Sequence, residues 1–471
     1  MADSIKTPLL VVGAGPGGYP AAFHAADLGM EVVLVDRDPN PGGVCLYRGC
    51  IPSKALLHAA QVIHEARTAE KLGITFGEPE IDFDKLRAWK DSVVEKLTSG
   101  LGGLTKQRKI RYVRGTARFA GPDRAIVALT DGGEQEIVFE NAILATGSEP
   151  TRLPFLPDSS RVMDSTGALA LDHLPKRLLV MGGGYIGLEL GQVYATLGCT
   201  VTVVEMKPSL LPGADPDLVK PLAKVCTTQF HKILLDTSVT AVTEKGDQLT
   251  VAFRDTAGKT FEEAFDRVLV AVGRRPVSKG LGLEQAGVQL TAQGFAQIDE
   301  ARRTTSERIY AVGDIAGQPM LAHKATHEGR CAVEAIHGKK HIYDPRAIPA
   351  VVFTDPEIAW CGLTEDEARR GGRRIRVGLF PWQASGRAAT LDRPDGVSKI
   401  VADAETGLVL GVGVAGYGAG ELIGEGVVAI EMGATAEDLA LSIHAHPSLS
   451  ETIMEAAERV MGQSTHYFQR M

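Results

Sequence analysis

The chain contains few cysteines and no long apolar run. Its 471 residues include six cysteines, which is too few for the disulfide framework of a small secreted domain. No stretch of about eighteen apolar residues occurs, so we expect no membrane-spanning helix. The formal net charge of −8 argues against nucleic acid or an anionic membrane as the main partner. The sequence therefore predicts a globular cytoplasmic protein that binds neither nucleic acid nor membrane.

No signal or transit peptide is expected at the start of the chain. The apolar residues 9–12 lead directly into a glycine loop at Gly13 and are better explained as a first strand. The length of the chain is sufficient for about three domains. The cysteines that we expect to be buried and without chemistry are Cys199, Cys226, Cys331 and Cys361.

A repeated segment is present in the first half of the chain. Residues 9–39 align without gaps with residues 178–208, and each copy has a G-x-G-x-x-G loop and ends with an acid. Each copy predicts a strand, a loop, a helix and a second strand, with a dinucleotide pyrophosphate at the helix N-terminus. Two copies therefore predict two doubly wound α/β domains, each binding one dinucleotide. The glycines are Gly13, Gly15, Gly18, Gly182, Gly184 and Gly187, and the acids are Asp36 and Glu205.

The acid that ends the second copy bears on the choice of nucleotide. Glu205 can accept hydrogen bonds from both hydroxyls of an adenosine ribose, whereas it would repel a 2′-phosphate. A nearby arginine could override this preference, but the next residues are Met206 and Lys207. We therefore predict NAD rather than NADP.

Two cysteines follow the first glycine loop in a CxxxxC pattern. In an extended strand Cys45 and Cys50 would lie roughly 16 Å apart, so they can form a disulfide only if the chain folds back. Gly49 can supply the backbone geometry for that reversal. The alternative is half of a zinc site, which would need a second ligand pair that the sequence lacks, and we expect no metal. Pro52 predicts a helix start here, and a helix N-terminus favours the Cys50 thiolate.

The segment 42–54 resembles the redox-active disulfide of the pyridine nucleotide-disulfide oxidoreductase flavoproteins. This family includes dihydrolipoamide dehydrogenase, glutathione reductase and mercuric reductase. The resemblance implies that Cys45 exchanges with a substrate dithiol and that Cys50 contacts the flavin. It also places Lys54 beside the flavin, although a solvated lysine is the alternative. The order of the two loops implies FAD in the first domain and NAD in the second.

Further segments resemble nucleotide-binding positions of the family. Asp314, at the end of the segment 305–314, resembles the acid that holds the ribityl chain of FAD; in isolation it would be a turn or cap residue. The other positions that the resemblance assigns to FAD are Gly115, Ala117, Thr146, Gly147 and Ala322. The positions that it assigns to NAD are Tyr185, Glu189, Val239, Ala271 and Gly273.

Two of these residues have open alternatives. Tyr185 stands where some members have a lid over the nicotinamide, but it could equally pack against the sheet. Glu189 is implied to pair with Lys54, whereas on sequence alone it is an ordinary acid in the first turn of a helix.

The C-terminal third, from about residue 348, alternates strands and helices and predicts an α+β domain. Near its end, the family resemblance makes His446 the acid/base and Glu451 the acid that orients it. A histidine suits this task because its ordinary pKa lies near working pH. The alternative for Glu451 is a helix cap only, because Ser448-x-x-Glu451 is a capping box.

The resemblance covers nearly the whole chain and is strongest to the dihydrolipoamide dehydrogenases. It implies a homodimer that oxidises protein-bound dihydrolipoyl groups and reduces NAD+, with lipoyl domains, an acyltransferase (E2) core or the glycine cleavage H protein as partners. Alternatives are another disulfide reductase of the family, although 465–471 lack a mercuric-reductase cysteine pair, or a docking subunit. One departure is Tyr47-Arg48, where an asparagine and a small residue are commoner. The implied domains are 1–148 (FAD, first part), 149–275 (NAD), 276–347 (central, FAD second part) and 348–471 (dimer interface).

Overall fold

The computed structural model describes residues 4–468, which fall into two packing units. Unit 1 contains the residues up to Ala55, Ile81–Thr151 and Gly273–Asp344. Unit 2 contains Leu56–Glu80, Arg152–Val272 and the residues from Pro345 onward. The domain boundaries implied by the sequence stay a prediction, and each unit is described by itself.

Unit 1 is built on a parallel sheet with the strand order β3-β2-β1-β5-β16, the order of a doubly wound dinucleotide-binding domain. The long strands β3 and β5 continue beyond it and pair antiparallel with β4. The strands are β1 (Ile5–Val12), β2 (Val32–Asp36), β3 (Arg111–Gly121), β4 (Arg124–Leu129), β5 (Glu134–Leu144) and β16 (Ile309–Ala311), with the pair β6 (Ser148–Pro150) and β15 (Arg274–Pro276).

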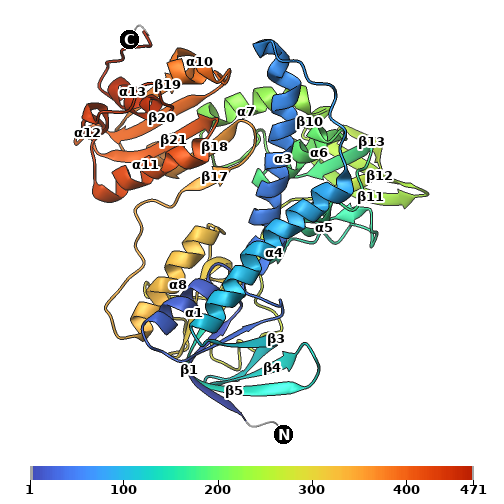
Figure 1. The fold of residues 1–471 in the computed structure, drawn as a ribbon, viewed down its shortest axis with the longest axis vertical. Coiled ribbons are helices and arrows are strands. Elements are labelled where there is room, and N and C mark those ends of the chain that lie inside the picture. The colour runs from blue at the N-terminus through green and yellow to red at the C-terminus, as the bar shows by residue number, and fades with distance from the viewer. Residues whose placement is uncertain (1–3, 469–471) are drawn as a thin grey trace. The chain divides into compact units, whose positions relative to one another are not determined.

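Helices α1 and α8 pack side by side against this sheet (Figure 1). Fully buried Leu9, Val11 and Ile143 of the sheet share one apolar cluster with Ala21 of α1 and Ala332 of α8. The first glycine loop follows directly from the carboxyl end of β1. The helices of unit 1 are α1 (Gly18–Asp27), α2 (Gly43–Arg48), α3 (Cys50–Thr68), α4 (Phe83–Gln107), η2 (Gly313–Ala316) and α8 (Ala322–Ile336). Of these, α3 continues into unit 2 from Leu56 onward.

The first part of unit 2 repeats the topology of unit 1. Its parallel sheet has the order β10-β9-β8-β14-β7, and an antiparallel meander of β11, β12 and β13 accompanies it. The sequence repeat is thus a repeat of structure. The elements are η1 (Ala69–Leu72), β7 (Val162–Met163), α5 (Ser165–Ala170), β8 (Arg177–Met181), α6 (Tyr185–Thr196), β9 (Thr200–Val204), α7 (Pro216–Gln229), β10 (Lys232–Leu234), β11 (Thr237–Lys245), β12 (Gln248–Asp255), β13 (Thr260–Phe265) and β14 (Arg267–Val270).

The C-terminal part of unit 2 is an antiparallel sheet in the order β17-β18-β21-β20-β19 (Figure 1). Helix α7 covers one face, where Leu218 lies against Gly413, and α11 covers the other, where Gly426 lies against Val412. The elements are β17 (Ala350–Val352), β18 (Glu357–Gly362), α9 (Glu365–Arg370), β19 (Ile375–Pro381), η3 (Trp382–Ala384), α10 (Gly386–Thr390), β20 (Val397–Asp403), β21 (Val409–Gly416), α11 (Ala419–Met432), α12 (Ala436–Leu441) and α13 (Glu451–Val460).

Both doubly wound sheets and the α+β sheet predicted from the sequence are present. Within residues 4–468, no helix combines the length and the apolar character needed to cross a membrane.

Candidate active site

The first glycine loop is shaped by close backbone contacts. Gly13 has φ +97°, and a Cβ there would lie 2.4 Å from the carbonyl oxygen of Ala145. A Cβ on Gly18 would lie 1.8 Å from the carbonyl oxygen of Gly13. The carboxylate of Asp36 accepts a hydrogen bond from the N–H of Ala14 at 2.6 Å. Burial raises the pKa of Asp36, although backbone donors oppose this shift.

The second loop has the same construction. A Cβ on Gly182 (φ +110°) would lie 2.5 Å from the carbonyl oxygen of Ala271, and one on Gly187 would lie 2.1 Å from that of Gly182. The carboxylate of Glu205 accepts a hydrogen bond from the N–H of Gly183 at 2.7 Å. In both loops the terminal acid therefore lies directly beside the loop backbone, as a ribose-binding acid must.

The middle glycine of each loop has no such packing reason. A Cβ on Gly184 would meet nothing within 4 Å, and one on Gly15 would come no closer than 3.8 Å to Gly43. Protein contacts therefore do not explain why these two positions lack a side chain. Close approach of a pyrophosphate does explain it, so both loops fit a dinucleotide.

The predicted cysteine segment folds back on itself between α2 and α3. A Cβ on Gly49 would lie 2.8 Å from the carbonyl oxygen of Val44, so close approach is what requires a glycine there. Cys50 begins α3, as expected. A hydrogen bond with Cys50 raises the pKa of the Cys45 thiol, and burial adds to the shift, whereas the charge of Lys54 opposes it. The structure thus brings both cysteines and Lys54 together.

The unusual pair Tyr47-Arg48 connects α2 to the segment that follows β2. Arg48 pairs with Asp38 at 2.5 Å, and the Tyr47 hydroxyl accepts from the N–H of Asn40 at 3.2 Å and donates to its carbonyl at 3.1 Å. The hydroxyl of Tyr112 donates to the carbonyl of Asp38 at 2.9 Å. Tyr47 and Arg48 therefore tie α2 to residues 38–40, which follow β2.

Asp314 lies in η2, and two residues that sequence reasoning missed orient it. The hydroxyl of Ser148 donates to its carboxylate at 2.5 Å. Arg274 Nε in turn donates to the Ser148 hydroxyl at 2.7 Å. In the sequence, Ser148 and Arg274 are marked only by their positions directly after Gly147 and Gly273.

The other predicted nucleotide positions lie at strand ends, on a sheet or at a helix start. A Cβ on Gly115 would lie 2.4 Å from the carbonyl oxygen of Ala128, where β3 begins to pair with β4. The Thr146 hydroxyl donates to the carbonyl of Val277 at 2.8 Å. Ala117 is buried in the sheet core, Ala322 begins α8, Val239 lies beside a bulge of β11, and Ala271 and Gly273 follow β14.

Tyr185 and Glu189 lie on α6 after the second loop. Tyr185, the first residue of the helix, is 41% exposed, which fits a surface position better than packing against the sheet. Glu189 is buried, and its carboxylate accepts from the N–H of Phe353 at 3.0 Å. The expectation that it is a first-turn acid is wrong, because the helix already begins at Tyr185. Its pairing with Lys54 stays a prediction.

The predicted acid/base pair is formed within unit 2. His446 Nδ1 lies 2.9 Å from Glu451 Oε1, and the side chain of His446 is 73% exposed. The second oxygen of Glu451 accepts from the N–H of Ser448 at 2.7 Å. Burial alone would raise the pKa of Glu451, yet these two hydrogen bonds hold it below its usual value. Glu451 therefore does more than cap the helix, since it also contacts the imidazole.

Two models of known protein families match the chain. Residues 7–329 match the model of the pyridine nucleotide-disulphide oxidoreductase family, and residues 348–457 match its dimerisation domain. The chain belongs to this family. It is 49% identical over 468 residues to a dihydrolipoyl dehydrogenase of Vibrio cholerae, covering 99% of this chain and 98% of that protein. A dihydrolipoyl dehydrogenase of Haemophilus influenzae is also 49% identical, with 99% and 97% covered.

Two solved structures have the same fold. LpdA of Mycobacterium tuberculosis is 29% identical and superposes with a TM-score of 0.89, covering 97% of this chain and all of that one. The HOCl-induced flavoprotein disulfide reductase RclA of Escherichia coli is also 29% identical, with a TM-score of 0.87 and 97% and 99% covered.

Membership of the pyridine nucleotide-disulphide oxidoreductase family confirms three predictions. The fold class is the predicted one, and the chain is an oxidoreductase. Its cofactors are FAD and NAD(H), for which both glycine loops are shaped. The dimerisation-domain match supports a homodimer.

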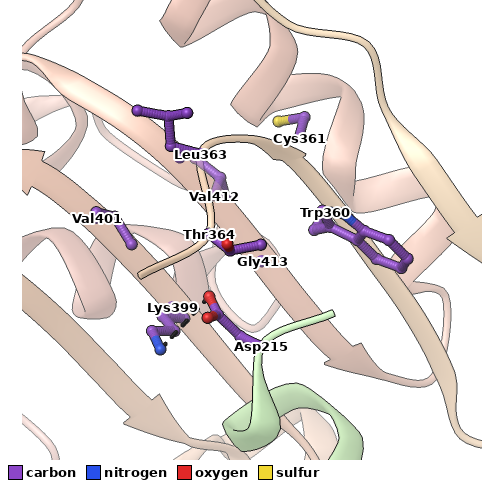
Figure 2. Close-up of a pocket in the computed structure, with 10 residues that line it drawn as sticks. Asp215, Trp360, Cys361, Leu363, Thr364, Lys399, Val401, Val412 and Gly413 are labelled. Carbon is purple, nitrogen blue, oxygen red and sulfur yellow. Dashed lines mark ion pairs between the residues drawn. The ribbon is translucent and has the colours of Figure 1, made fainter. Parts of the chain in front are cut away.

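A small pocket in unit 2 is lined by none of these residues. Lys399 and Asp215 form an ion pair at one end of it (Figure 2). No group of three or more potential metal ligands suited to an ion was found among residues 4–468. The lining residues are Asp215, Trp360, Cys361, Leu363, Thr364, Lys399, Val401, Gly411, Val412 and Gly413.

Lys399 joins α7 and α9 to the C-terminal sheet. Its side chain is 2% exposed, and Nζ lies 2.8 Å from Asp217, 2.7 Å from Glu365 and 3.5 Å from Asp215. Burial alone would lower the pKa of Lys399, but the acids that surround it raise the pKa above its usual value. The cluster therefore depends on its single buried cation.

We expect Lys399→Met to lower the free energy of unfolding by about 3 kcal/mol, because three carboxylates lose their shared counter-ion. Urea unfolding followed by tryptophan fluorescence measures the loss, since Trp382, which directly follows β19, is fully buried. Lys224→Met is the matched control. It breaks the Lys224–Asp395 pair, whose lysine is 71% exposed, and should cost less than about 1 kcal/mol. Equal losses of unfolding free energy for the two variants would show that the buried Lys399 cluster stabilises the fold no more than an exposed ion pair does.

Proposed function

We propose that this chain oxidises protein-bound dihydrolipoyl groups to the lipoyl disulfide and reduces NAD+. The observation that carries the proposal is the adjacent Cys45 and Cys50 side chains in α2 and α3, which follow the first glycine loop, α1 and β2 in the chain. Its support comes from full-length relatives, 49% identical, that are named dihydrolipoyl dehydrogenase.

The two cysteines have different environments and different roles in this proposal. Cys50 is exposed and begins α3, where the helix dipole favours a thiolate. In the oxidised resting form that we propose, Cys45 and Cys50 share a disulfide. A substrate thiolate attacks the half-buried Cys45, which breaks the Cys45–Cys50 bond, releases Cys50 as a thiolate and forms a mixed disulfide; the second substrate thiol then attacks the substrate sulfur of that mixed disulfide and releases Cys45. The substrate leaves as a disulfide, and Cys45 and Cys50 are left reduced. Bound FAD supplies the two-electron link between this thiol pair and the nicotinamide.

His446 is the proton acceptor in this scheme. Its imidazole takes the proton of the substrate thiol, which makes that thiol a nucleophile. The 2.9 Å contact with Glu451 fixes the ring and stabilises the imidazolium that forms. The exposure of the ring, 73%, leaves it accessible to a partner subunit or to a lipoyl arm.

The active assembly that we propose is a homodimer in the cytoplasm, in which His446 of one subunit serves the cysteines of the other. Its substrates are lipoyl domains, and its larger partners are the acyltransferase (E2) core of a 2-oxo acid dehydrogenase complex or the glycine cleavage H protein. A double Cys45→Ser, Cys50→Ser protein that still bound such a core with equal affinity would separate docking from catalysis.

The experiment that tests the proposal compares three candidate substrates. Purified protein is given dihydrolipoamide with NAD+, and NADH is followed at its absorbance maximum; in parallel, oxidised glutathione and Hg(II) are offered with NADH and, separately, with NADPH. We expect turnover with dihydrolipoamide only. A faster reaction with either alternative substrate would assign the chain to another branch of the family.

We expect NAD+ to be preferred over NADP+ by at least about tenfold, or ~1.4 kcal/mol, because Glu205 would meet the 2′-phosphate. The kcat/KM values for the two nucleotides measure this preference. Glu205→Gln should reduce the preference while leaving the NAD+ rate close to normal, since the amide still accepts from the N–H of Gly183. Equal use of both nucleotides by the unmodified protein would mean that Lys207 neutralises the acid.

A further inference from the structure

A buried ion cluster lies beside the turn that carries Asp314. Glu328 and Lys324 stand on consecutive turns of α8, and their side chains are 0% and 4% exposed. The carboxylate of Glu328 pairs with Lys324 Nζ at 3.2 Å and accepts from Arg302 Nη1 at 3.0 Å. One carboxylate thus balances two cations where an unpaired charge would be costly.

The same two side chains of α8 hold the backbone of Gly313. Its N–H donates to Glu328 Oε2 at 2.7 Å, and its carbonyl accepts from Lys324 Nζ at 3.3 Å. Lys324 also donates to the carbonyl of Gly317 at 2.9 Å, so it spans η2 from end to end. Gly313 has φ +78°, and a glycine has little intrinsic preference for one backbone conformation. The geometry of the turn therefore depends on these side-chain contacts.

Arg302, the second cation, is itself held in a less common conformation. Its φ is +66°, which few residues with a side chain adopt. Its guanidinium lies 4.5 Å from the ring centroid of Tyr343, and its carbonyl accepts from the N–H of Ala311 at the end of β16. Local strain of this kind persists where the surrounding structure fixes a residue in place.

We propose that Glu328 and Lys324 are positioning residues for FAD that act through Gly313 on Asp314. Glu328 is fully buried and cannot touch a ligand, but the residue after Gly313 is the acid assigned to the ribityl chain. The hydroxyl of Ser148 holds the Asp314 side chain, while α8 holds its backbone. Loosening Gly313 displaces Asp314, so FAD affinity falls. This inference rests on the FAD cofactor and on the assignment of Asp314 to it.

The test is a double-mutant cycle on FAD binding. Flavin-stripped full-length protein is titrated with FAD, and the quenching of flavin fluorescence gives Kd. Glu328→Gln should weaken binding by about tenfold to a hundredfold, as loss of charged hydrogen bonds does. Asp314→Asn should weaken it similarly. If Glu328 acts through Asp314, the Kd of the double variant for FAD should lie within about twofold of the higher of the two single-variant Kd values. A double variant whose loss of FAD affinity equals the product of the two single losses would overturn the proposal.

Lys399→Met is the control for the loss of a buried ion cluster, because Lys399 is buried with ion-pair partners in unit 2 as Glu328 is in unit 1. It should lose stability and keep normal FAD affinity. An affinity loss equal to that of Glu328→Gln would mean general destabilisation, and the proposal would fall. If Glu328→Gln does not fold, Lys324→Gln replaces it in the same cycle. Unmodified protein that binds FAD but does not oxidise dihydrolipoamide would overturn the proposed function alone, whereas failure to bind FAD would overturn the cofactor.

Discussion

Replacement of Cys45 by serine should lower NAD+-dependent oxidation of dihydrolipoamide by about 10³-fold or more, as loss of an essential nucleophile does. A serine hydroxyl cannot form the mixed disulfide that carries the electrons. Cys50→Ser should be as damaging, since Cys45 then has no partner with which to form a disulfide. The NADH-forming rate with dihydrolipoamide measures both losses.

The control for this experiment is another cysteine of the same chain. Cys199 is buried, and its thiol already lies 3.7 Å from the carbonyl of Lys176, so a serine hydroxyl can keep that contact. Cys199→Ser should therefore retain a nearly normal rate. NADH oxidation by an artificial acceptor should survive in all three variants, because it needs no thiol. Normal dihydrolipoamide oxidation by Cys45→Ser would remove the cysteine pair from the mechanism.

Replacement of His446 by glutamine should slow dihydrolipoamide oxidation by about 10²-fold or more, because the amide cannot take the thiol proton. FAD binding and the cysteine pair should be unaffected, since His446 lies in a different unit of the chain. Glu451→Gln should cost less, about tenfold, because the imidazole remains but loses its charged partner. Steady-state kcat values with saturating dihydrolipoamide measure these effects.

His444→Gln provides the matched comparison, two residues away. The His444 ring lies 2.8 Å from Glu425 and its side chain is 9% exposed, which marks it as structural. Its replacement should leave kcat nearly normal while it lowers the thermal midpoint. If His446→Gln turned over normally, Glu451 would serve only as a helix cap and the base would have to be sought elsewhere.

The sequence predicted the parts of the site that local pattern encodes. Both glycine loops follow from a repeat, because the first and third glycines are required by contacts within a few residues or with the adjacent strand. The position of Cys50 at a helix start follows from Pro52 in the first turn. The contact between His446 and Glu451 lies within one short segment, so the family resemblance could place it.

Long-range pairing accounts for most of what the sequence could not predict. The Ser148 and Arg274 contacts that orient Asp314 join segments far apart in the chain. In the sequence, nothing distinguishes Glu328 from the other charged residues of a helix. Its contact with the N–H of Gly313 follows only from the packing of α8 beside that residue. Glu189 was misplaced in the first turn because no sequence signal marks α6 as beginning at Tyr185.

Four cysteines provide an internal reference for the most direct measurement. They are Cys199, Cys226, Cys331 and Cys361, all buried, and burial raises the pKa of each thiol to about 11 or 12. Thiols with such values are poor nucleophiles at neutral pH. Burial also keeps an alkylating reagent away from these four thiols, whereas Cys50 is exposed and Cys45 half-buried. Because the pKa of Cys45 is raised as well, alkylation of the native protein should report first on Cys50 and more slowly on Cys45.

The decisive measurement is alkylation of the anaerobic protein before and after dihydrolipoamide, read by peptide mass spectrometry. Cys45 and Cys50 should be protected in the oxidised protein, become labelled once dihydrolipoamide is added, and return to protection when NAD+ follows. That cycle would show that the pair carries the electrons from dithiol to nicotinamide. Labelling of the pair that did not respond to either reagent would contradict it.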